Sequence, residues 1–417
     1  MVRKKQFSDT KLIAVNKIID LVNDGKFTIA IALLHKHFKP STEVFMFITG
    51  WIAQLQGNHE RAIKLFEKTL IVNPTNLDAL TGLSSSYTEL KDFTKAMQCA
   101  ESAKLLQPAD PKVILTLATI ISMQFRNINE KQLEAKQLFM EAFALATNLA
   151  VSNNKLLEDI LIGWGACLID LKQFFSARSI LEHAITINPY SILANKNIAS
   201  AYAAIGEIDL AIKALKVAQL STDPNIIIDC VYQEGMLHIL QENYAKGWRA
   251  HEMRLQALNF PQKKLLLNTK FDIDSINEHD NILVFQEQGI GDLLQFARYL
   301  PMLYSKCKNI DLAIIKNEYS ESHKQFLFDN LKHCIRDIYV QKENVIPNIY
   351  SHSISLMSLP FYFKTRENNI PPPIEWKATY NDTRDIIGIC WQGSIHNLND
   401  SARSVPINTI KTFIEDN

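Results

Sequence analysis

Residues 62–108, AIKLFEKTLIVNPTNLDALTGLSSSYTELKDFTKAMQCAESAKLLQP, show the clearest repeating pattern in the first half of the chain. The stretch holds two helical patterns that each run into a proline, and Pro74 and Pro108 lie 34 positions apart. Small residues precede each proline at equivalent positions, and Ala62 in one copy corresponds to Ala96 in the next. This period predicts a repeated unit of two antiparallel helices.

The same pattern returns further along the chain. A third copy contains Gly165, Phe174, Ala177, Ala184 and Pro189, and a fourth contains Tyr202, Gly206, Ala211, Leu215 and Ala218, with Pro224 one residue late. The period is that of the tetratricopeptide repeat, and we expect a helical solenoid of about seven units over residues 8–258. This count includes a loose first unit, a long unit at 109–155 and a degenerate last unit, QENYAKGWRAHEMR (241–254). Such an array stacks into an open surface that usually holds a protein or peptide partner.

The small residues predict where the helices of a unit cross closely. These positions are Ala62, Ala96, Ala177 and Ala211, with Gly50 and Gly165 on the preceding helices. Larger residues such as Phe66 fill the space between units, and Gly57 and Gly206 suit the turns between paired helices. Four residues at helical spacing are expected to pack: Tyr87, Phe139, Tyr202 and Met236. Asn195 and Asn197 are compatible both with a groove that holds a peptide backbone and with a solvated face.

Composition bounds the possible functions. The 417 residues carry 44 basic and 44 acidic side chains, and a net charge of zero argues against a nucleic-acid partner. The N-terminus, MVRKKQFSDT, has no apolar segment behind it that would indicate a signal peptide, and no apolar run approaches a membrane span. The six cysteines are scattered without the spacing of a metal site, which favours reduced thiols in a cytoplasmic protein.

The pattern changes near residue 260. Short runs rich in β-branched residues then alternate with helical segments, which predicts a parallel α/β sheet of the doubly wound kind. The expected strands are NILVF (281–285), IDLAIIK (310–316), DIYV (337–340), a segment near SISLM (353–357) and IIGICW (386–391). We expect one domain over residues 259–380 and the start of another over 381–417, joined through the proline-rich segment 367–382.

The first chemical cluster is NILVFQEQGIGDLLQFARYLP (281–301). A strand ends at Phe285, a turn follows, and a helix is expected from near Asp292. Ligands bind at the carboxyl edge of open α/β sheets, where Gly289 and Gly291 let a substrate approach the backbone and are candidate donor- or phosphate-binding residues. Gln288 is a further cleft candidate. The Asp292 carboxylate suits such a crevice, and it equally suits a helix N-cap.

The second cluster is IIGICWQGSIHNLNDSARSVP (386–406). Gly393 and Ser394 are candidates for an anion cradle, and the planar fork of Arg403 is suited to a phosphate. Two further residues are as compatible with a turn or a cap, namely Asp400 and Ser404. His396 is a cleft candidate whose alternative is a structural hydrogen-bonding histidine.

Taken together, several strings resemble the bacterial tetratricopeptide-repeat glycosyltransferases, which are distantly similar to the O-linked N-acetylglucosamine transferase/SPINDLY type and to the heptosyltransferases. The strings are FQEQGIGDLLQFARYLPML (285–303), LMSLP (356–360) and GICWQGSIHNLNDSARSVP (388–406), after KGWRAHEMR (246–254). The resemblance implies a GT-B architecture of two Rossmann-like domains with the active site between them. It implies an acceptor-side domain over 259–380 and a donor-side domain that begins at 381.

The resemblance also implies residue roles. Asp292 matches the aspartate after the glycine turn, a candidate general base toward an acceptor hydroxyl. Arg403 and Ser404 match an Arg-Ser pair that contacts the donor phosphates. Asp400-Ser401 stands where the family has Asp-Arg, which puts one cationic contact in doubt. The substrate would be a nucleotide sugar, and no cofactor or metal is implied.

The resemblance implies further that most of the donor-side domain would follow Asn417. The expectation is therefore a glycosyltransferase-like protein that transfers a sugar to a protein or glycan acceptor recruited by the repeats, inactive as this fragment and a poor binder of nucleotide sugars. It would be an enzyme if the full-length protein has the donor domain. The alternative is a non-catalytic scaffold in which the repeats bind partners.

Overall fold

The computed structural model describes residues 9–148, 154–257, 262–266, 271–317, 320–341 and 349–377. The chain divides into two compact units, residues 1–214 and residues 215–417. The predicted cluster at 386–406 and the expected strand at 386–391 lie outside the described residues.

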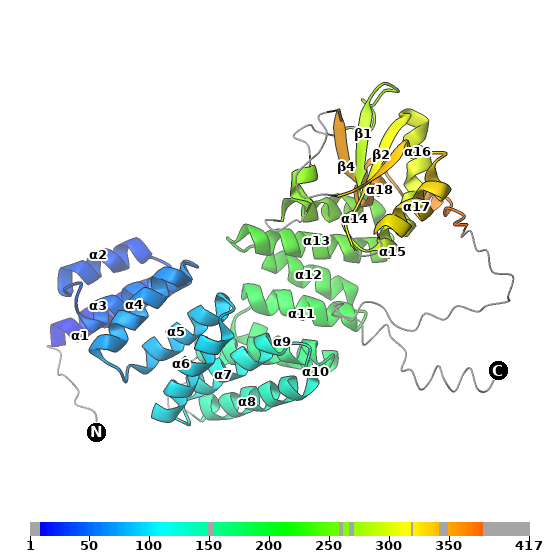
Figure 1. Cartoon of the computed structure of the whole chain (residues 1–417). Helices are drawn as coiled ribbons and strands as arrows, with labels where there is room; N and C mark the ends of the chain where they lie inside the picture. Colours follow the sequence, from blue (N-terminus) through cyan, green and yellow to red (C-terminus); the bar gives the residue numbers. More distant parts are fainter. Residues whose placement is uncertain are drawn as a thin grey trace. The chain divides into compact units, whose positions relative to one another are not determined.

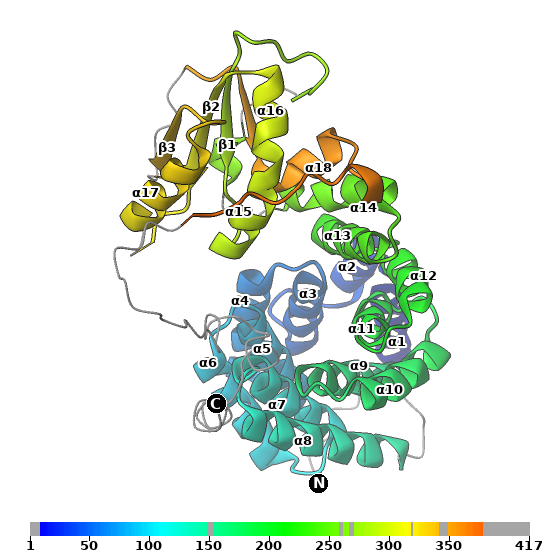
Figure 2. The same ribbon diagram turned by 90° about the vertical axis from the view of Figure 1, so that its right-hand side faces the viewer.

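The first unit consists of successive helices (Figures 1 and 2). They are α1 (Asp9–Asn23), α2 (Phe27–His37), α3 (Glu43–Leu55), α4 (His59–Val72), α5 (Leu77–Glu89), α6 (Phe93–Leu106), α7 (Pro111–Gln124), α8 (Asn129–Thr147), α9 (Asn154–Asp170), α10 (Phe174–Ile187) and α11 (Ile192–Ala204), and α12 (Ile208–Ala218) runs into the second unit. Helices α3 to α10 pack as consecutive pairs, and each pair also packs on the next. The predicted repeats are therefore confirmed as a stack of helix pairs.

Glycine and alanine lie where the paired helices cross. A Cβ atom added to Gly165 would lie 2.4 Å from Cγ of Leu181, and one added to Gly50 would lie 3.0 Å from the ring of Phe66. The predicted small positions are fully buried, namely Ala62, Ala96, Ala177 and Ala211. Space, and not helix propensity, fixes these residues, because a larger side chain would separate the helices.

The turn inside each repeat uses a left-handed residue. Gly57 has a φ of 74° and Gly206 a φ of 84°, as the sequence predicts. Lysine occupies the same turn in two other repeats, with a φ of 61° at Lys91 and 58° at Lys172. A residue with a Cβ atom is strained in this region, so these two repeats carry a local cost that the glycine repeats avoid.

Some of the polar and aromatic helix residues have the expected roles, and others do not. Phe139 is buried, and the Tyr87 hydroxyl donates a hydrogen bond to Glu67 at 3.1 Å. Asn195 is also buried, and its amide nitrogen donates to two carbonyl oxygens at the start of its own helix, 3.0 and 2.9 Å away. It therefore fixes the helix start and does not line a groove. Met236 is 45% exposed, so the expectation that it packs is wrong.

The second unit begins with the last repeat and continues into a sheet. Its further elements are α13 (Pro224–Leu240), α14 (Tyr244–His251), η1 (Glu252–Gln256), η2 (Lys263–Leu265), β1 (Asn281–Phe285), α15 (Ile290–Phe296), η3 (Ala297–Tyr299), α16 (Leu300–Lys306), β2 (Asn309–Ile314), α17 (Ser320–Leu331), β3 (Asp337–Val340), β4 (His352–Ser355), η4 (Leu356–Ser358), α18 (Leu359–Tyr362) and η5 (Glu367–Asn369). The backbones of α13 and α14 touch at two glycines, because a Cβ on Gly235 would lie 3.0 Å from the carbonyl oxygen of Gly247.

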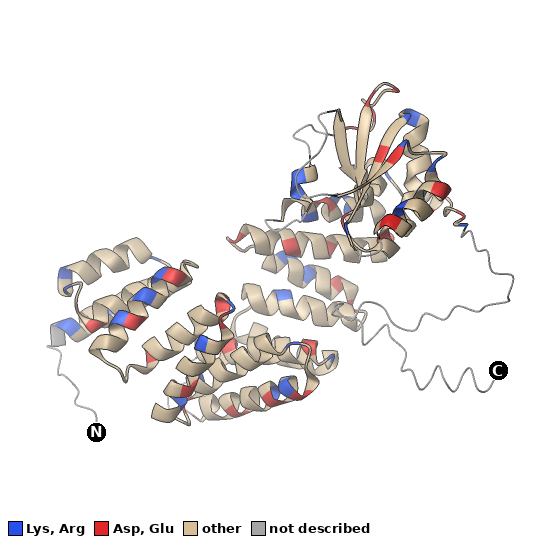
Figure 3. Cartoon of the chain, viewed as in Figure 1, with Lys and Arg blue, Asp and Glu red and all other residues tan. Residues whose placement is uncertain are grey.

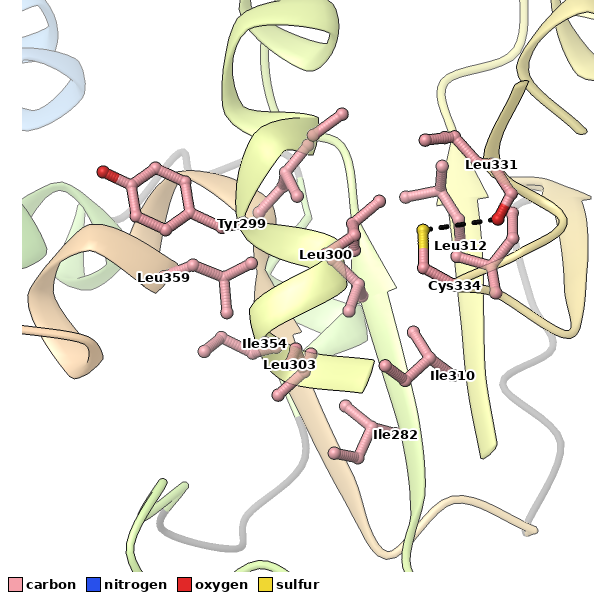
Figure 4. Close-up of a cluster of buried hydrophobic side chains, with 14 of the residues drawn as sticks. Ile282, Tyr299, Leu300, Leu303, Ile310, Leu312, Leu331, Cys334, Ile354 and Leu359 are labelled. Carbon is pink, nitrogen blue, oxygen red and sulfur yellow. Dashed lines mark hydrogen bonds between the residues drawn. The ribbon is translucent and has the colours of Figure 1, made fainter. Parts of the chain in front are cut away.

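Among the described residues the four strands form one parallel sheet in the order β3-β2-β1-β4. Side chains alternate between its two faces. Ile282 and Val284 of β1 join the core beneath α15, α16 and α17, whereas Leu283 and Phe285 face Tyr350 and the segment around η2. Figure 4 shows the helix-side core, in which Ile282, Ile310 and Leu312 lie beside Leu300 and Leu303 of α16. β1 and β4 pair directly, and both contribute side chains to this core.

The observed strands match the four predicted ones within the described residues. β1 and β3 have the expected bounds, β2 begins at Asn309, and β4 begins at His352 and ends before the η4 turn. The helix predicted from near Asp292 begins two residues earlier, at Ile290. The predicted boundary at 258–259 marks the change from helix pairs to strands, and it stays a prediction as a domain boundary.

Candidate functional site

The candidate site lies at the carboxyl end of β1, where the order of the strands reverses. β1 pairs with β2 on one side and with β4 on the other, so the chain leaves the sheet in two directions at this point. A crevice forms at such a place in open α/β sheets and is the usual ligand position. The residues after Phe285 and Ser355 therefore share one edge of the sheet.

Gln286 fixes the turn that follows β1. Its side-chain nitrogen donates to the carbonyl oxygen of Gln288 at 2.7 Å, and its side-chain oxygen accepts from the backbone of Ile315 at 2.9 Å. Gln341 closes the arrangement by donating to the Gln286 carbonyl oxygen at 3.0 Å. The buried amide thus ties the turn to the ends of β2 and β3, which holds the following residues in one position.

Glu287 is the most enclosed charge of this turn. Its side chain is 2% exposed, and its Oε1 atom lies 2.6 Å from one guanidinium nitrogen of Arg254 and accepts from the Arg254 Nε at 2.8 Å. The Ser355 hydroxyl, at the end of β4, donates to the same oxygen at 2.8 Å. A charged pair in this environment is stable only when its hydrogen bonds are satisfied, and three donors satisfy Oε1.

Arg254 comes from η1, at the end of the last repeat. Besides Glu287 it donates to Glu252 at 2.7 Å, to the backbone carbonyl of His251 at 2.9 Å and to the Ser358 hydroxyl at 3.0 Å. The last repeat, the turn after β1 and the residues after β4 are thereby joined through one buried guanidinium. We call these six residues the Arg254 cluster: His251, Glu252, Arg254, Glu287, Ser355 and Ser358.

The electrostatics of the Arg254 cluster are set by burial. Burial lowers the pKa of His251 to about 3, and the Arg254 charge acts in the same direction. Nδ1 of His251 lies 3.0 Å from Arg254, and since arginine only donates, this nitrogen accepts and the ring proton is on Nε2. Burial also raises the pKa of Glu252, against the opposing effect of Arg254. Oε2 of Glu287 is buried and has no hydrogen-bond partner within the described part of the chain.

Asp292 lies beside this cluster, in the first turn of α15. Gly289 is the N-cap, so Asp292 does not occupy the cap position that the sequence also allowed. A Cβ on Gly289 would approach only the Asp292 carboxylate, at 3.7 Å, and a Cβ on Gly291 would meet nothing within 4 Å. Neither glycine has a positive φ, so open space, and not backbone conformation, distinguishes these two positions.

Tyr232 of α13 also belongs to the site. Burial raises the pKa of its hydroxyl, the negative charges of Glu287 and Asp292 act in the same direction, and a hydrogen bond joins it to the Gln288 side chain. Its ring lies 5.4 Å from that of His251. The structure thus brings Gln288, Gly289, Gly291 and Asp292 together with a neutral tyrosine hydroxyl. The predicted Gly393, Ser394, His396, Asp400, Arg403 and Ser404 lie outside the described residues.

Sequence reasoning missed the Arg254 cluster and Tyr232. Glu287 directly follows an apolar strand, which is a signal for an edge carboxylate, but the glycines and Asp292 are the more conspicuous residues of the turn. Arg254 is separated from Glu287 by 33 positions, and no periodicity links the two. Within the described ranges no group of three or more His, Cys, Asp or Glu residues is placed to hold a metal ion.

The comparisons with known proteins identify the repeats. The family model described as tetratricopeptide repeat matches residues 53–120, so the chain contains repeats of this class. No curated protein matches the sequence. Within the described residues no helix has the length and apolar character needed to cross a bilayer.

The solved structures that are similar to part of this chain include tetratricopeptide-repeat proteins and a pilus biogenesis factor. The tetratricopeptide-repeat protein TTC0263 of Thermus thermophilus is 16% identical, with 45% of this chain and 97% of that chain covered and a TM-score of 0.41. PilW, a type IV pilus biogenesis factor, is 16% identical over 52% of this chain and 94% of that chain, with a TM-score of 0.42. A tetratricopeptide-repeat protein from Parabacteroides merdae is 16% identical over 58% and 91%, with a TM-score of 0.39.

Proposed function

We propose that the protein is a glycosyltransferase of the GT-B type, in which the repeats hold a protein or glycan acceptor and the sheet unit is the acceptor-side half. The strand order β3-β2-β1-β4 supports this proposal, because doubly wound nucleotide-binding sheets begin in that order. Tetratricopeptide-repeat proteins bind protein partners, which supports the role of the repeats.

The observation that carries the proposal is the position of Asp292. Its carboxylate lies at the strand edge where the chain order reverses, next to two glycines of which Gly291 borders open space. An acceptor hydroxyl that approaches over these glycines lies next to the Asp292 carboxylate, which can accept its proton. Asp292 takes the hydroxyl proton while the oxygen bonds to the anomeric carbon, and the bond from that carbon to the nucleotide phosphate breaks.

The remaining roles belong to the same proposal. Tyr232 and Gln288 orient the acceptor, and the Arg254 cluster keeps the turn in place. Gly393, Ser394, Arg403 and Ser404 are the proposed donor- or phosphate-binding residues of the second cluster, and His396 and Asp400 are its further candidates. We place the protein in the cytoplasm, where its cysteines stay reduced; the five cysteines in the described ranges form no disulfide bond.

The second candidate function is a non-catalytic scaffold. It is favoured by the family match, which falls on the repeats alone, at residues 53–120. In this case the sheet unit extends the interaction surface and turns over no donor.

A hydrolysis screen separates the two functions. The complete protein is incubated with a panel of nucleotide sugars, and release of free nucleotide is measured by chromatography. We expect release from one donor class above the rate without protein. Absence of release from every donor would contradict the transferase and leave the scaffold.

A further inference from the structure

A pocket of about 540 Å³ lies inside the second unit, apart from the Asp292 turn. It is formed by α14, the segment 271–274 and the residues of α18 with those that follow it. Its volume is within the range of small-ligand sites, roughly 300–1,000 Å³. The pocket is partly open to solvent, so a ligand can enter without unfolding of the unit.

Aromatic rings make up much of the wall. The aromatic lining residues are Tyr244, Trp248, Phe271, Phe361 and Tyr362. Phe271 is buried and packs edge-on against Tyr362 at 4.8 Å, whereas the other four are half-buried and leave part of their surface free. The ring centroids of Trp248 and Phe296 of α15 are 6.3 Å apart. One wall residue of the pocket therefore also packs against the helix that contains Asp292.

Charges of both signs surround these rings (Figure 3 shows the charged residues of the chain). The basic lining residues are Arg249, Lys364 and Arg366, and the acidic ones are Asp272 and Asp274. Lys364 and Asp274 form an exposed pair at 3.6 Å. A binding site for an anion would show cations alone, and one for a cation would show carboxylates alone. The mixture of donors and acceptors instead suits a ligand with many hydroxyl groups.

A second hollow of about 350 Å³ continues the first and shares Tyr244, Ala245 and Arg366 with it. Its other lining residues are Glu242, Asn243, Glu367 and Asn368. We call these two adjoining hollows, with their aromatic, amide and charged lining, the groove. None of the described lining residues belongs to a strand, so an extended peptide has no sheet edge to pair with here.

We propose that this groove binds a neutral oligosaccharide. The apolar C–H faces of its sugar rings lie against the half-buried aromatic rings, and its hydroxyl groups bond to the arginine and aspartate side chains around them. The inference rests on the proposed function, because it assigns the glycan acceptor to a groove lined by the last repeat together with the sheet unit, and it adds the site and the ligand class.

The test is equilibrium binding by the complete protein in the absence of any nucleotide sugar. The labelled protein is applied to a printed array of neutral and acidic oligosaccharides, and the affinity for the brightest glycan is then measured by calorimetry. We expect a neutral glycan to bind, and both Phe361→Ala and Arg249→Ala to weaken it about tenfold, as expected for loss of one ring contact or one charge-assisted hydrogen bond.

Two controls keep the result interpretable. Lys246→Ala removes an exposed cation from the same helix outside the groove lining and should leave the affinity unchanged. Thermal unfolding of each variant shows whether it is folded. Lack of glycan binding, preference for acidic glycans, or equal affinity in folded Phe361→Ala and Arg249→Ala proteins would overturn the inference.

Failure of the inference and failure of the transferase give different results. Glycan binding without nucleotide release in the hydrolysis screen keeps the groove and rejects the transferase. Nucleotide release without glycan binding keeps the transferase and rejects the groove.

Discussion

Arg254 and Glu287 form a buried ion pair, 2.6 Å between guanidinium nitrogen and carboxylate oxygen, that joins the end of the last repeat to the turn after β1. Its partners include hydroxyl groups at the end of β4 and just beyond it. The last repeat is thereby part of the framework that holds the candidate site.

Removal of one partner of this pair should strongly destabilise the second unit. Arg254→Met leaves the Glu287 carboxylate buried without its cation, which costs about 3–5 kcal/mol in such pairs. The free energy of unfolding is measured by urea titration. Hydrogen exchange of the peptide that contains β1 shows whether the loss of stability falls on the second unit. Lys364→Met, which removes one partner of an exposed pair at 3.6 Å, is the control and should change this free energy by less than about 1 kcal/mol.

The double variant Arg254→Met/Glu287→Met completes this experiment. It removes both charges, so a large part of the lost stability should return. Equal destabilisation by Arg254→Met and Lys364→Met would show that the pair is not important for the unit.

The close helix crossing in the first unit predicts a steric effect. Gly165→Ala places a methyl group 2.4 Å from Cγ of the buried Leu181, and overpacking of this kind costs about 1–3 kcal/mol. Circular dichroism during heating measures the loss. Gly291→Ala, whose new methyl group meets nothing within 4 Å in helix α15, should not lower the melting temperature and should raise it slightly, because alanine favours the helix over glycine.

Gly165→Ala/Leu181→Ala should recover part of the loss from overpacking, although the smaller Leu181 side chain adds its own packing cost. A fully additive double variant would contradict the steric account.

Equivalent turn positions in two repeats predict opposite effects. Gly57 and Lys91 are 34 positions apart, with φ values of 74° and 61°. Gly57→Ala should destabilise by about 1 kcal/mol, because an L side chain is strained in the left-handed region. Lys91→Gly should stabilise by a few tenths to about 1 kcal/mol, since it removes the same strain but raises the entropy of the unfolded chain. Chemical unfolding of both variants tests the pair, and the same sign for both would refute it.

His251 predicts a pH dependence of the second unit. Its pKa falls from 6.5 to about 3 in the folded chain, so the unfolded chain binds the proton first as the pH falls. The neutral ring stabilises the fold above pH 6.5, and this contribution declines between pH 6.5 and 3, at a slope of at most about 1.4 kcal/mol per pH unit.

The measurement compares urea midpoints at about pH 7 and about pH 5 in the native protein and in His251→Gln, whose side chain does not titrate. The native protein should lose more stability than His251→Gln over this interval. Identical losses would mean that His251 is protonated equally in both states.

The sequence predicted what a repeating or alternating pattern encodes. Gly50, Ala62 and Ala96 mark helix crossings because the same steric need recurs in each repeat. The strands were equally visible, since NILVF and DIYV are short apolar runs bounded by polar turns. The repeat period and the apolar strand runs both depend on residues that are close together in the chain. Both patterns can therefore be recognised in a single sequence.

Contacts between distant segments left no such signal. Arg254 contacts Glu287 and Ser358 because the fold brings three separate chain segments to one edge of the sheet. The segment KGWRAHEMR contains no pattern that predicts these two partners. The sequence predicts the start of α15 two residues too late, because aspartate is a favoured cap residue and draws the predicted start to Asp292. The observed N-cap is Gly289. Asn195 proved structural, since its partners are backbone carbonyls of its own helix start.

Donor-dependent sugar transfer by two matched variants of the complete protein, followed through the nucleotide that it releases, is the decisive measurement. Asp292 and Glu321 are both acids in the first turn of a helix that follows a strand, α15 after β1 and α17 after β2. Asp292→Asn keeps the shape of the side chain but removes the proton acceptor. We predict at least about a hundredfold loss of donor-dependent transfer in Asp292→Asn and no change in Glu321→Gln. Equal transfer by both variants would contradict the placement of the reaction at the turn after β1.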